Sequence, residues 1–424
     1  MKRAAFVICI VLGVCVFVLG ASSSMGAQKK AKVSAPPATT TWFKTFGGPN
    51  FKVLYAVSHT ADGGCVAVGY AFASKFPPPN LWVLRLNARG DKLWERTFPK
   101  AIHGSSFYNV RLGPDGSIFV LACKNLAEGN SLRDGLRVIK MDDTGRVIWE
   151  KEFGKEVTWY GNALAATADG GCVFGGSRFN KARNRDTGWV IKLDKQGNVV
   201  WETFLESAQY EGSALTETPD HHYLFAYTAI ESGEGLRVAK LDAAGTVVWQ
   251  RGYSSFGKNS SDVVQSIVCT RDGGIIVSGG TTLGVIKGFV IKLDAEGKWL
   301  WDRGGITGRA SACPADDGGA YVLFCQDYLL VIKLDRMGTM EWVRMLGEPR
   351  VRYCGYDMDE TMDGHFVLVG SQLLSAIKSA PFVMKVDKNA RIPSMPKLNM
   401  DPSFRPDTMT KDIFKPVALP SRGK

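Results

Sequence analysis

The sequence predicts an all-β fold, a seven-bladed β-propeller with four strands in each blade. Two motifs repeat along the chain and keep step with each other. The first is spelled VIKLDKQGNVVW at 190–201 and returns as VAKLDAAGTVVW at 238–249, VIKLDAEGKWLW at 290–301 and VIKLDRMGTMEW at 331–342, with looser copies starting at Val83, Val138 and Val383. A catalytic site needs one copy of its motif, so seven copies indicate architecture.

The second motif is a turn that starts with Asp and continues with Gly in six of its seven copies. The turns start at Asp62, Asp115, Asp169, Asp220, Asp272, Asp317 and Asp363. Their spacing of 45 to 54 residues is typical of a solenoid, a propeller or another repeat array. The residues around the turns alternate and are rich in β-formers, as in GGCVAVGY at 63–70, and no segment has a sustained helical period.

Each repeat therefore predicts four strands. The first precedes the Asp turn, the second follows it, the third is the VIKLD segment and the fourth contains the Trp. Gly suits the first hairpin because it adopts positive φ without steric cost. The Asp that ends VIKLD can accept hydrogen bonds from backbone amides of the second hairpin. The Trp offers a large apolar surface that can wedge between neighbouring sheets.

The two ends of the repeat array predict how the ring closes. Trp42 opens the array without a VIKLD segment before it, and the last such segment, at 381–387, is followed by ARIPS where a Trp is due. The N-terminal strand should therefore complete the seventh sheet. One propeller over residues 41–388 accounts for all seven repeats.

The repeats resemble those of bacterial secreted propellers spelled W-x-K-T-F-G-G, D-G-G and K-L-D-x-x-G-x-x-x-W. Trp42–Gly48, Thr270–Gly274 and Lys292–Trp301 carry this spelling. These proteins are similar to the wider quinoprotein-like superfamily, whose docking motif A-x-D-x-x-T-G-x-x-x-W has one more residue between Asp and Gly and a Thr that this chain lacks. Quinone-binding dehydrogenases of that class have eight blades. The resemblance implies a propeller and leaves the activity open.

The flanks of the array predict export. Basic residues at 1–3, an apolar run at 4–20 and small residues at 21–27 have the layout of a signal peptide over 1–27. The alternative is an uncleaved membrane anchor. Residues 28–40 read as a linker and 389–424 as a Pro-rich tail. We expect a periplasmic or extracellular protein, tethered to the membrane only if the N-terminal segment stays uncleaved.

The net charge limits the class of partner. The chain carries +11, which falls to about +9 (11 minus 2) when the signal peptide is removed. Export and the lack of basic runs interleaved with aromatics argue against nucleic acid. A basic exported monomer fits a protein partner or an anionic polymer of the cell envelope.

Seven cysteines follow the signal peptide. Cys65 and Cys172 occupy equivalent places in separate blades, as do Cys123 and Cys325. Such pairs are too far apart to form a disulfide, so we expect buried thiols. Cys313 and Cys325 share a blade and could pair.

The innermost strands predict what lines the central channel. Residues five before each turn Asp are all apolar and should face the core, so those at six and four before should face the channel. The row at six before is Ala56, Asn109, Ala163, Ala214, Ser266, Ser311 and Asp357; the row at four before is Ser58, Arg111, Ala165, Thr216, Val268, Cys313 and Asp359. Asp357 and Asp359 could bind calcium or act as an acid–base pair. Alternatively they line a hydrated channel in which Arg111 balances their charge.

A second candidate site is the rim of the face opposite the Asp turns. Trp159, Tyr210, Asp262 and Tyr353 stand ten residues before their turns, and the loop after the second strand of the third blade adds Arg183 and Arg185. Aromatic and Arg side chains at a concave mouth suit a peptide or an anionic glycan. Aromatic side chains that merely fill gaps between loops are the alternative.

These observations favour a non-catalytic binding or scaffold module for a protein or an envelope polymer. The alternative is a propeller enzyme, quinone-dependent or glycan-active, that uses Asp357 and Asp359. We predict no cofactor and no metal, with calcium at the carboxylate pair as the exception to test. The missing docking motif argues against a quinone, and the absence of an aligned acid, base and nucleophile argues against hydrolysis.

Overall fold

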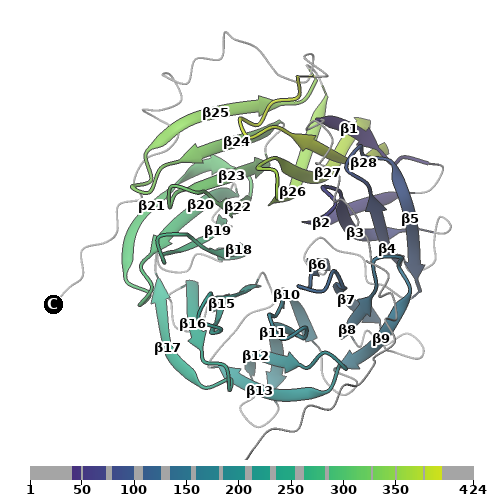
Figure 1. Ribbon diagram of the computed structural model, residues 1–424. Coiled ribbons are helices and arrows are strands. Elements are labelled where there is room, and N and C mark those ends of the chain that lie inside the picture. Colours follow the sequence, from purple (N-terminus) through teal and green to yellow (C-terminus); the bar gives the residue numbers. More distant parts are fainter. Residues whose placement is uncertain are drawn as a thin grey trace, which may run out of the picture. The chain divides into compact units, whose positions relative to one another are not determined.

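The computed structural model confirms a ring of seven antiparallel four-stranded sheets around a central channel (Figure 1). It describes residues 41–48, 51–72, 79–99, 108–125, 134–153, 159–180, 185–205, 213–229, 235–253, 262–281, 286–325, 328–348, 351–375 and 378–393. No helix that could span a bilayer occurs in these ranges. The predicted signal peptide, the linker and the tail beyond residue 393 lie outside them.

Each of blades 1 to 6 is a meander whose strands follow chain order from the channel outward. Blades 1 and 2 contain β2 (Lys52–His59), β3 (Cys65–Ala71), β4 (Asn80–Leu86), β5 (Lys92–Phe98), β6 (Tyr108–Leu112), β7 (Ile118–Asn125), β8 (Asp134–Met141) and β9 (Val147–Phe153). Blades 3 and 4 contain β10 (Trp159–Ala166), β11 (Cys172–Asn180), β12 (Arg185–Leu193), β13 (Val199–Leu205), β14 (Ser213–Glu217), β15 (Tyr223–Ala229), β16 (Gly235–Leu241) and β17 (Val247–Tyr253). Blades 5 and 6 contain β18 (Asp262–Cys269), β19 (Ile275–Thr281), β20 (Lys287–Leu293), β21 (Trp299–Thr307), β22 (Ala310–Pro314), β23 (Ala320–Cys325), β24 (Leu329–Leu334) and β25 (Met340–Leu346).

Blade 7 joins the two ends of the described chain. It contains β26 (Arg352–Glu360), β27 (Phe366–Ser375), β28 (Lys378–Val386) and, outermost, β1 (Trp42–Thr45). Trp42 pairs with Lys385 in the register that places Trp201 opposite Lys192 in blade 3. The predicted closure by the N-terminal strand is confirmed. Ala390 and Ile392, within the predicted tail, are fully buried against blade 7.

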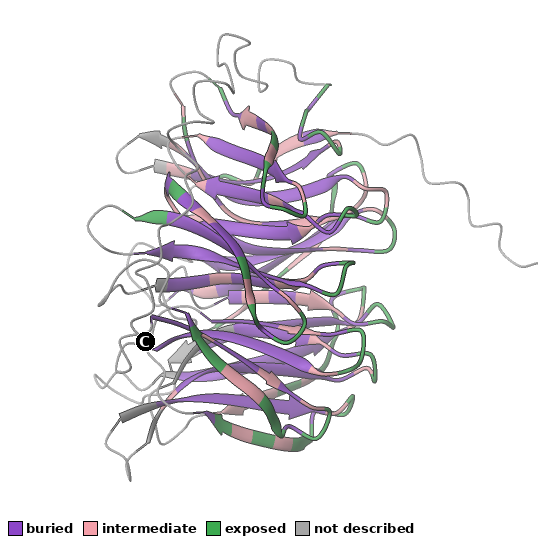
Figure 2. Ribbon diagram, turned by 90° about the vertical axis from the view of Figure 1, so that its left-hand side faces the viewer, coloured by how far each residue is buried: buried purple, intermediate pink, exposed green. Residues whose placement is uncertain are grey.

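The core lies between neighbouring blades. The second and third strands of the blades, such as β3 and β24, are buried on both faces, whereas outer strands such as β9 alternate exposed and half-buried residues (Figure 2). One hydrophobic cluster, for example, joins Phe119 and Leu121 of blade 2 to Phe174 and Trp189 of blade 3. Radial stacking thus buries the apolar faces that a single blade would expose.

Two tight turns in each blade lie on one face of the ring, which we call the turn face. In the first turn a Gly takes positive φ, such as 81° at Gly170, and blade 4 uses His221 at φ 58° instead. In the second turn the Asp side chain accepts backbone N–H bonds, as predicted. Asp294 Oδ1, for example, accepts them from Glu296 at 3.1 Å and Lys298 at 2.7 Å.

The repeated Trp docks each blade on the next. Trp201 of blade 3 donates its indole N–H to the Ala243 carbonyl of blade 4 at 3.0 Å. Its ring also covers Gly245, where an added Cβ would lie 2.6 Å from the indole. The Trp predicted to lie between neighbouring sheets therefore packs its indole ring on a glycine in a turn of the next blade. Trp42 makes the same contact with Gly90 where the ring closes.

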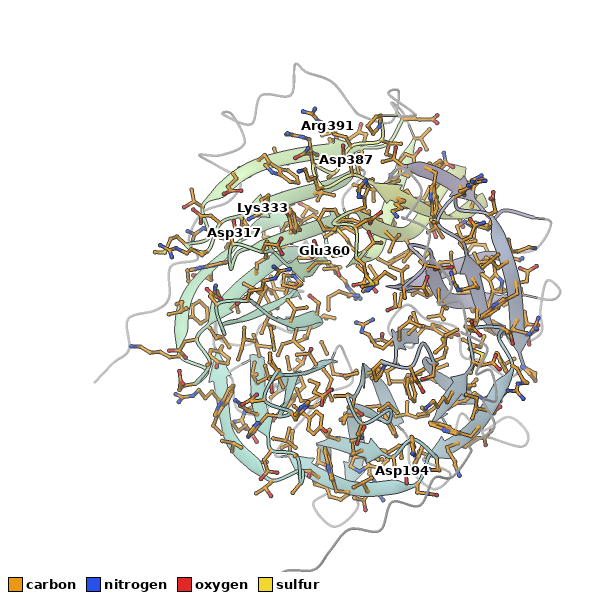
Figure 3. The ribbon with its side chains drawn as sticks, in the orientation of Figure 1. Asp194, Asp317, Lys333, Glu360, Asp387 and Arg391 are labelled. Carbon is orange, nitrogen blue, oxygen red and sulfur yellow. The ribbon has the colours of Figure 1, made fainter. Side chains whose placement is uncertain are left out.

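The basic residue of the VIKLD motif, Arg in blade 1 and Lys in the others, forms an ion pair with the turn Asp of its blade. The seven pairs, 2.5 to 3.7 Å long, are Arg85–Asp62, Lys140–Asp115, Lys192–Asp169, Lys240–Asp220, Lys292–Asp272, Lys333–Asp317 and Lys385–Asp363. Figure 3 labels the Lys333–Asp317 pair. Several of these cations also bond the next blade, as when Lys140 donates to the Gly170 carbonyl at 2.9 Å.

Candidate functional site

The innermost strands bring the predicted channel residues together. Asn109, Arg111, Asp357 and Asp359 line one cavity of about 110 Å³, to which Gln265 of blade 5 also contributes. The residues five before each turn Asp, such as Val57, are buried in the core, as expected. The two acids come from β26 and Arg111 from β6, so their approach depends on ring closure.

Asp357 connects three blades. Its Oδ2 accepts the Val57 N–H of blade 1 at 3.1 Å, and its Oδ1 accepts the Ser311 hydroxyl of blade 6 at 3.1 Å. Burial raises the pKa of Asp357 above its usual value, although Arg111 and these bonds act in the opposite direction. The carboxyl group is thus used as an acceptor at the junctions of blades 6, 7 and 1.

Asp359 makes a stronger contact across the same junction. Its Oδ2 accepts the backbone N–H of His59 at 2.8 Å and lies 2.8 Å from His59 Nδ1. Burial disfavours the carboxylate, but the bonds from His59 outweigh it and lower the pKa of Asp359. The same side-chain bond raises the pKa of His59. Together the two groups form a charge-assisted pair between blades 7 and 1.

His59 was absent from the sequence-based candidates. It stands three residues before Asp62, a row that was not compared between blades. That row contains Leu112 and Ala166 in blades 2 and 3 but Glu360 in blade 7. A comparison of this row would have shown a histidine in the blade that follows the two acids.

The channel position of Asp357 has a neutral counterpart in blade 5. Ser266, also six residues before its turn Asp, accepts the Ala312 N–H of blade 6 at 3.0 Å and bonds Ser278 at 2.7 Å. A side chain at this position therefore caps a backbone N–H of the following blade. Asp357 does the same with a carboxyl group, so its contacts are those of a junction residue.

Arg111 supplies positive charge to the channel wall. Its Nη1 donates to the Val110 carbonyl at 2.7 Å, and its charge lowers the pKa of both acids without overcoming burial at Asp357. The interpretation that Arg111 balances the acids electrostatically is consistent with this arrangement. Asn109 is half-buried on the same wall.

A larger cavity of about 740 Å³ opens the channel toward the turn face, and we call it the vestibule. Its charged lining residues are His59, Asp62, Arg85, Arg111, Asp143, Glu217 and Asp359. Asp62 and Arg85 pair at 2.7 Å, and Glu217 accepts the Ala168 N–H at 2.8 Å. Met362, 76% exposed, also lines it. The wall carries both basic and acidic side chains, which suits a polar ligand.

A tyrosine cluster fills the junctions of blades 7, 1 and 2. The ring centroid of Tyr55 lies 4.8 Å from Tyr356 and 5.9 Å from Tyr108, with the second pair stacked. Burial raises the pKa of all three phenols. These rings are neutral packing groups.

The predicted rim site is only partly described. Tyr353 is fully buried and contacts Phe43 and Phe382 within blade 7, so its prediction as a binding residue at the channel mouth is wrong. Its position near the start of β26, far from the Asp turn, agrees with the prediction. Its side chain is covered, because β1 places Phe43 against the Tyr353 ring. Trp159 and Asp262 begin β10 and β18 and Arg185 begins β12, but their side chains are not described. Tyr210 and Arg183 lie outside the described residues.

Metal-binding side chains are not clustered in the described ranges. No group of three or more His, Cys, Asp or Glu residues there could hold a metal ion. Asp357 and Asp359, the pair considered for calcium, accept the protein hydrogen bonds given above.

The comparison with family models matches residues 79–268 to the family described as outer membrane protein assembly factor BamB. The match runs from the third strand of blade 1 into the first strand of blade 5. The resemblance to quinoprotein-like propeller repeats is confirmed. No curated protein matches the chain.

Solved structures align with the chain at low sequence identity. A puromycin hydrolase mutant complexed with PGG aligns with a TM-score of 0.54 and 14% identity over 86% of this chain and 58% of that chain. A protein of unknown function from Dyadobacter fermentans DSM 18053 has a TM-score of 0.49 at 10% identity, over 81% of this chain and 98% of its own. One from Bacteroides caccae has 0.43 at 14%, over 66% and 92%. The first likeness supports the propeller architecture alone.

Proposed function

We propose that the protein is an exported, non-catalytic module whose ring binds a protein or an anionic polymer of the cell envelope. One observation carries the proposal. Asp357 and Asp359, the residues an enzyme would most need, accept hydrogen bonds from Val57, His59 and Ser311 and so join blades 6, 7 and 1. A carboxylate committed to a buried backbone N–H is costly to withdraw for chemistry.

Two further features support a binding role. The family matched by blades 2 to 4 is described as an assembly factor, a description that suits a propeller that holds other proteins. The net charge of +11 favours association with anionic surfaces and polymers.

A second candidate, an enzyme that uses the carboxylate pair, is favoured by the opposite pKa shifts of the two acids. The pKa of Asp357 is raised by burial and that of Asp359 is lowered by His59, and such a split is how carboxylate pairs divide acid and base roles. The vestibule would give substrate access to them.

Ligand-dependent thermal unfolding distinguishes the two candidates. We expect an anionic envelope oligosaccharide to raise the unfolding midpoint at low salt and to lose this effect at high salt, since exposed charges are screened. A neutral oligosaccharide of equal length is the control. Stabilisation by calcium or pyrroloquinoline quinone that Asp359→Asn abolishes would favour the enzyme instead.

A further inference from the structure

Two cysteines of different blades meet at the junction of blades 6 and 7. Cys325 ends β23 in blade 6, and Cys354 is the third residue of β26 in blade 7. Both thiols are half-buried, in contrast to Cys65, Cys123 and Cys172, which are fully buried. Their positions therefore combine proximity across two sheets with partial access from solvent.

Direct contacts join the two thiols. The sulfur of Cys325 shares a hydrogen bond with the thiol of Cys354 and accepts the backbone N–H of Gly355. The groups that act on the thiols of Cys65, Cys172, Cys269 and Cys313 include no second thiol.

The neighbouring backbone explains how the strands come so close. Leu329 pairs with Cys325 across β23 and β24. A Cβ added to Gly355 would lie 2.8 Å from Leu329 Cδ2 and 3.1 Å from Leu323 Cδ2. The absence of a side chain at Gly355 thus lets β26 rest on blade 6 and places Cys354 beside Cys325.

The pairing considered from the sequence, Cys313 with Cys325, is contradicted by the structure. Cys313 lies at the channel end of blade 6, where its thiol donates to the Met358 carbonyl at 3.1 Å. In the β22–β23 register it is opposite Tyr321, four residues from Cys325. Two cysteines of one blade need not lie close together, because the strand register keeps the sulfurs of Cys313 and Cys325 apart.

We propose that Cys325 and Cys354 form a disulfide bond that joins blade 6 to blade 7. In this reaction a thiolate of the pair attacks a sulfur of oxidised glutathione, which releases one glutathione thiolate and leaves a mixed disulfide. The second thiolate then attacks the protein sulfur of the mixed disulfide, forms the Cys325–Cys354 bond and releases the second glutathione thiolate. Two protein thiols lose two protons and two electrons, and the oxidant is reduced to two thiols. The bond lies one junction away from the closure of blades 7 and 1.

The experiment uses the purified full chain, incubated with oxidised or with reduced glutathione, treated with an alkylating reagent and digested for mass spectrometry. The expected product of oxidation is one cross-linked peptide pair containing Cys325 and Cys354, two hydrogens lighter than the separate peptides and absent after reduction. Cys269→Ser, which removes another half-buried thiol, should leave this product unchanged.

Thermal unfolding gives an independent readout that does not depend on digestion. Oxidation should raise the midpoint of the wild type and of Cys269→Ser by several degrees, because the cross-link restricts the unfolded chain, and should leave Cys325→Ser and Cys354→Ser unchanged. Circular dichroism of the reduced variants verifies that they fold. Separate alkylation of both cysteines after oxidation, glutathione adducts at either one, or a bond to another cysteine would overturn the proposal.

Discussion

At the junction of blades 7 and 1, and at that of blades 5 and 6, a channel side chain accepts a backbone N–H of the next blade. The two junctions differ in the group that accepts it. In blade 5 the Ser266 hydroxyl accepts a backbone N–H of the next blade, and in blade 7 the Asp357 carboxyl group does so. The junction of blades 7 and 1 adds the contact of Asp359 with His59, whereas blade 5 has Val268 at the position of Asp359. The ring therefore uses ionisable acceptors where residues 300 positions apart must meet.

The outer strand of blade 7 gives a physical reason for this difference. β1 has four residues, whereas the outer strands of the other blades have seven to nine. Blade 7 is also the blade in which strands from both ends of the array pair without a connecting turn. Charge-assisted hydrogen bonds, which are stronger than neutral ones, attach its inner strand to blade 1.

The largest effect should come from removing the Trp at the closure. Trp42 is 6% exposed and its ring covers Gly90. We expect Trp42→Ala to lower the free energy of unfolding by about 4 kcal/mol, measured by denaturant titration. Trp149→Ala, at a half-buried position between blades 2 and 3, should cost less. Equal losses would show that the closure does not depend on β1 more than an ordinary junction depends on its outer strand.

The next effect tests a contact that both junctions share. Lys385 bonds Asp363 at 3.0 Å and the Gly63 carbonyl of blade 1 at 3.1 Å, and Lys292 makes the equivalent bonds in blades 5 and 6. Each Lys→Met change should cost about 3 kcal/mol, because a backbone carbonyl of the next blade and the turn Asp both lose their charged donor. Chemical unfolding of the two variants should give similar losses. A much smaller loss at Lys292 would mean that this bond matters only at the closure.

A smaller effect separates the carboxyl group from the hydroxyl. Asp357→Ala leaves the Val57 N–H and the Ser311 hydroxyl without their acceptor and should cost about 2 kcal/mol, against about 1 kcal/mol for Ser266→Ala. Asp357→Asn should retain most of the stability, because its amide oxygen can still accept and the pKa of Asp357 is already raised toward the neutral form. If the Asn and Ala variants are equally unstable, the negative charge itself holds the junction.

The smallest effect depends on pH. The lowered pKa of Asp359 gives stability that is present above its unfolded-state value of about 4 and is lost as pH falls through the folded value. The raised pKa of His59 gives stability that is present below about 6.5 and is lost as pH rises through the folded value. Both contributions are present between about pH 4 and pH 6.5.

We therefore expect His59→Gln to cost about 1 kcal/mol near pH 5.5, a value kept small by partial exposure of the pair. The cost should shrink above the folded pKa of His59. Asp359, Glu360 and Asp363 all favour the charged imidazole, so unfolding curves of both proteins across the pH range should converge at alkaline pH. A cost that does not change with pH would show that the imidazole acts there only by packing.

The sequence predicted the architecture well because periodic signals report it. Seven Trp positions and seven Asp turns set the blade count, and the unmatched Trp42 predicted the closure. The contacts of Asp357 and Asp359 could not be predicted, since a sequence row shows an unusual charge but not the N–H 300 residues away that binds it. The prediction that Tyr353 is a rim residue was wrong for a similar reason, because its burial depends on Phe43, which comes from the other end of the propeller sequence.

The central claim is that Asp357 and Asp359 hold blade 7 against blade 1 and do not bind a ligand. The direct test is thermal unfolding of the wild type and of the Asp357→Asn/Asp359→Asn double variant at pH 6, each with and without calcium and pyrroloquinoline quinone. We predict a lower midpoint for the double variant without any ligand, and no response of either protein to calcium or the quinone. An unchanged midpoint in the double variant, together with ligand stabilisation seen only in the wild type, would contradict the account.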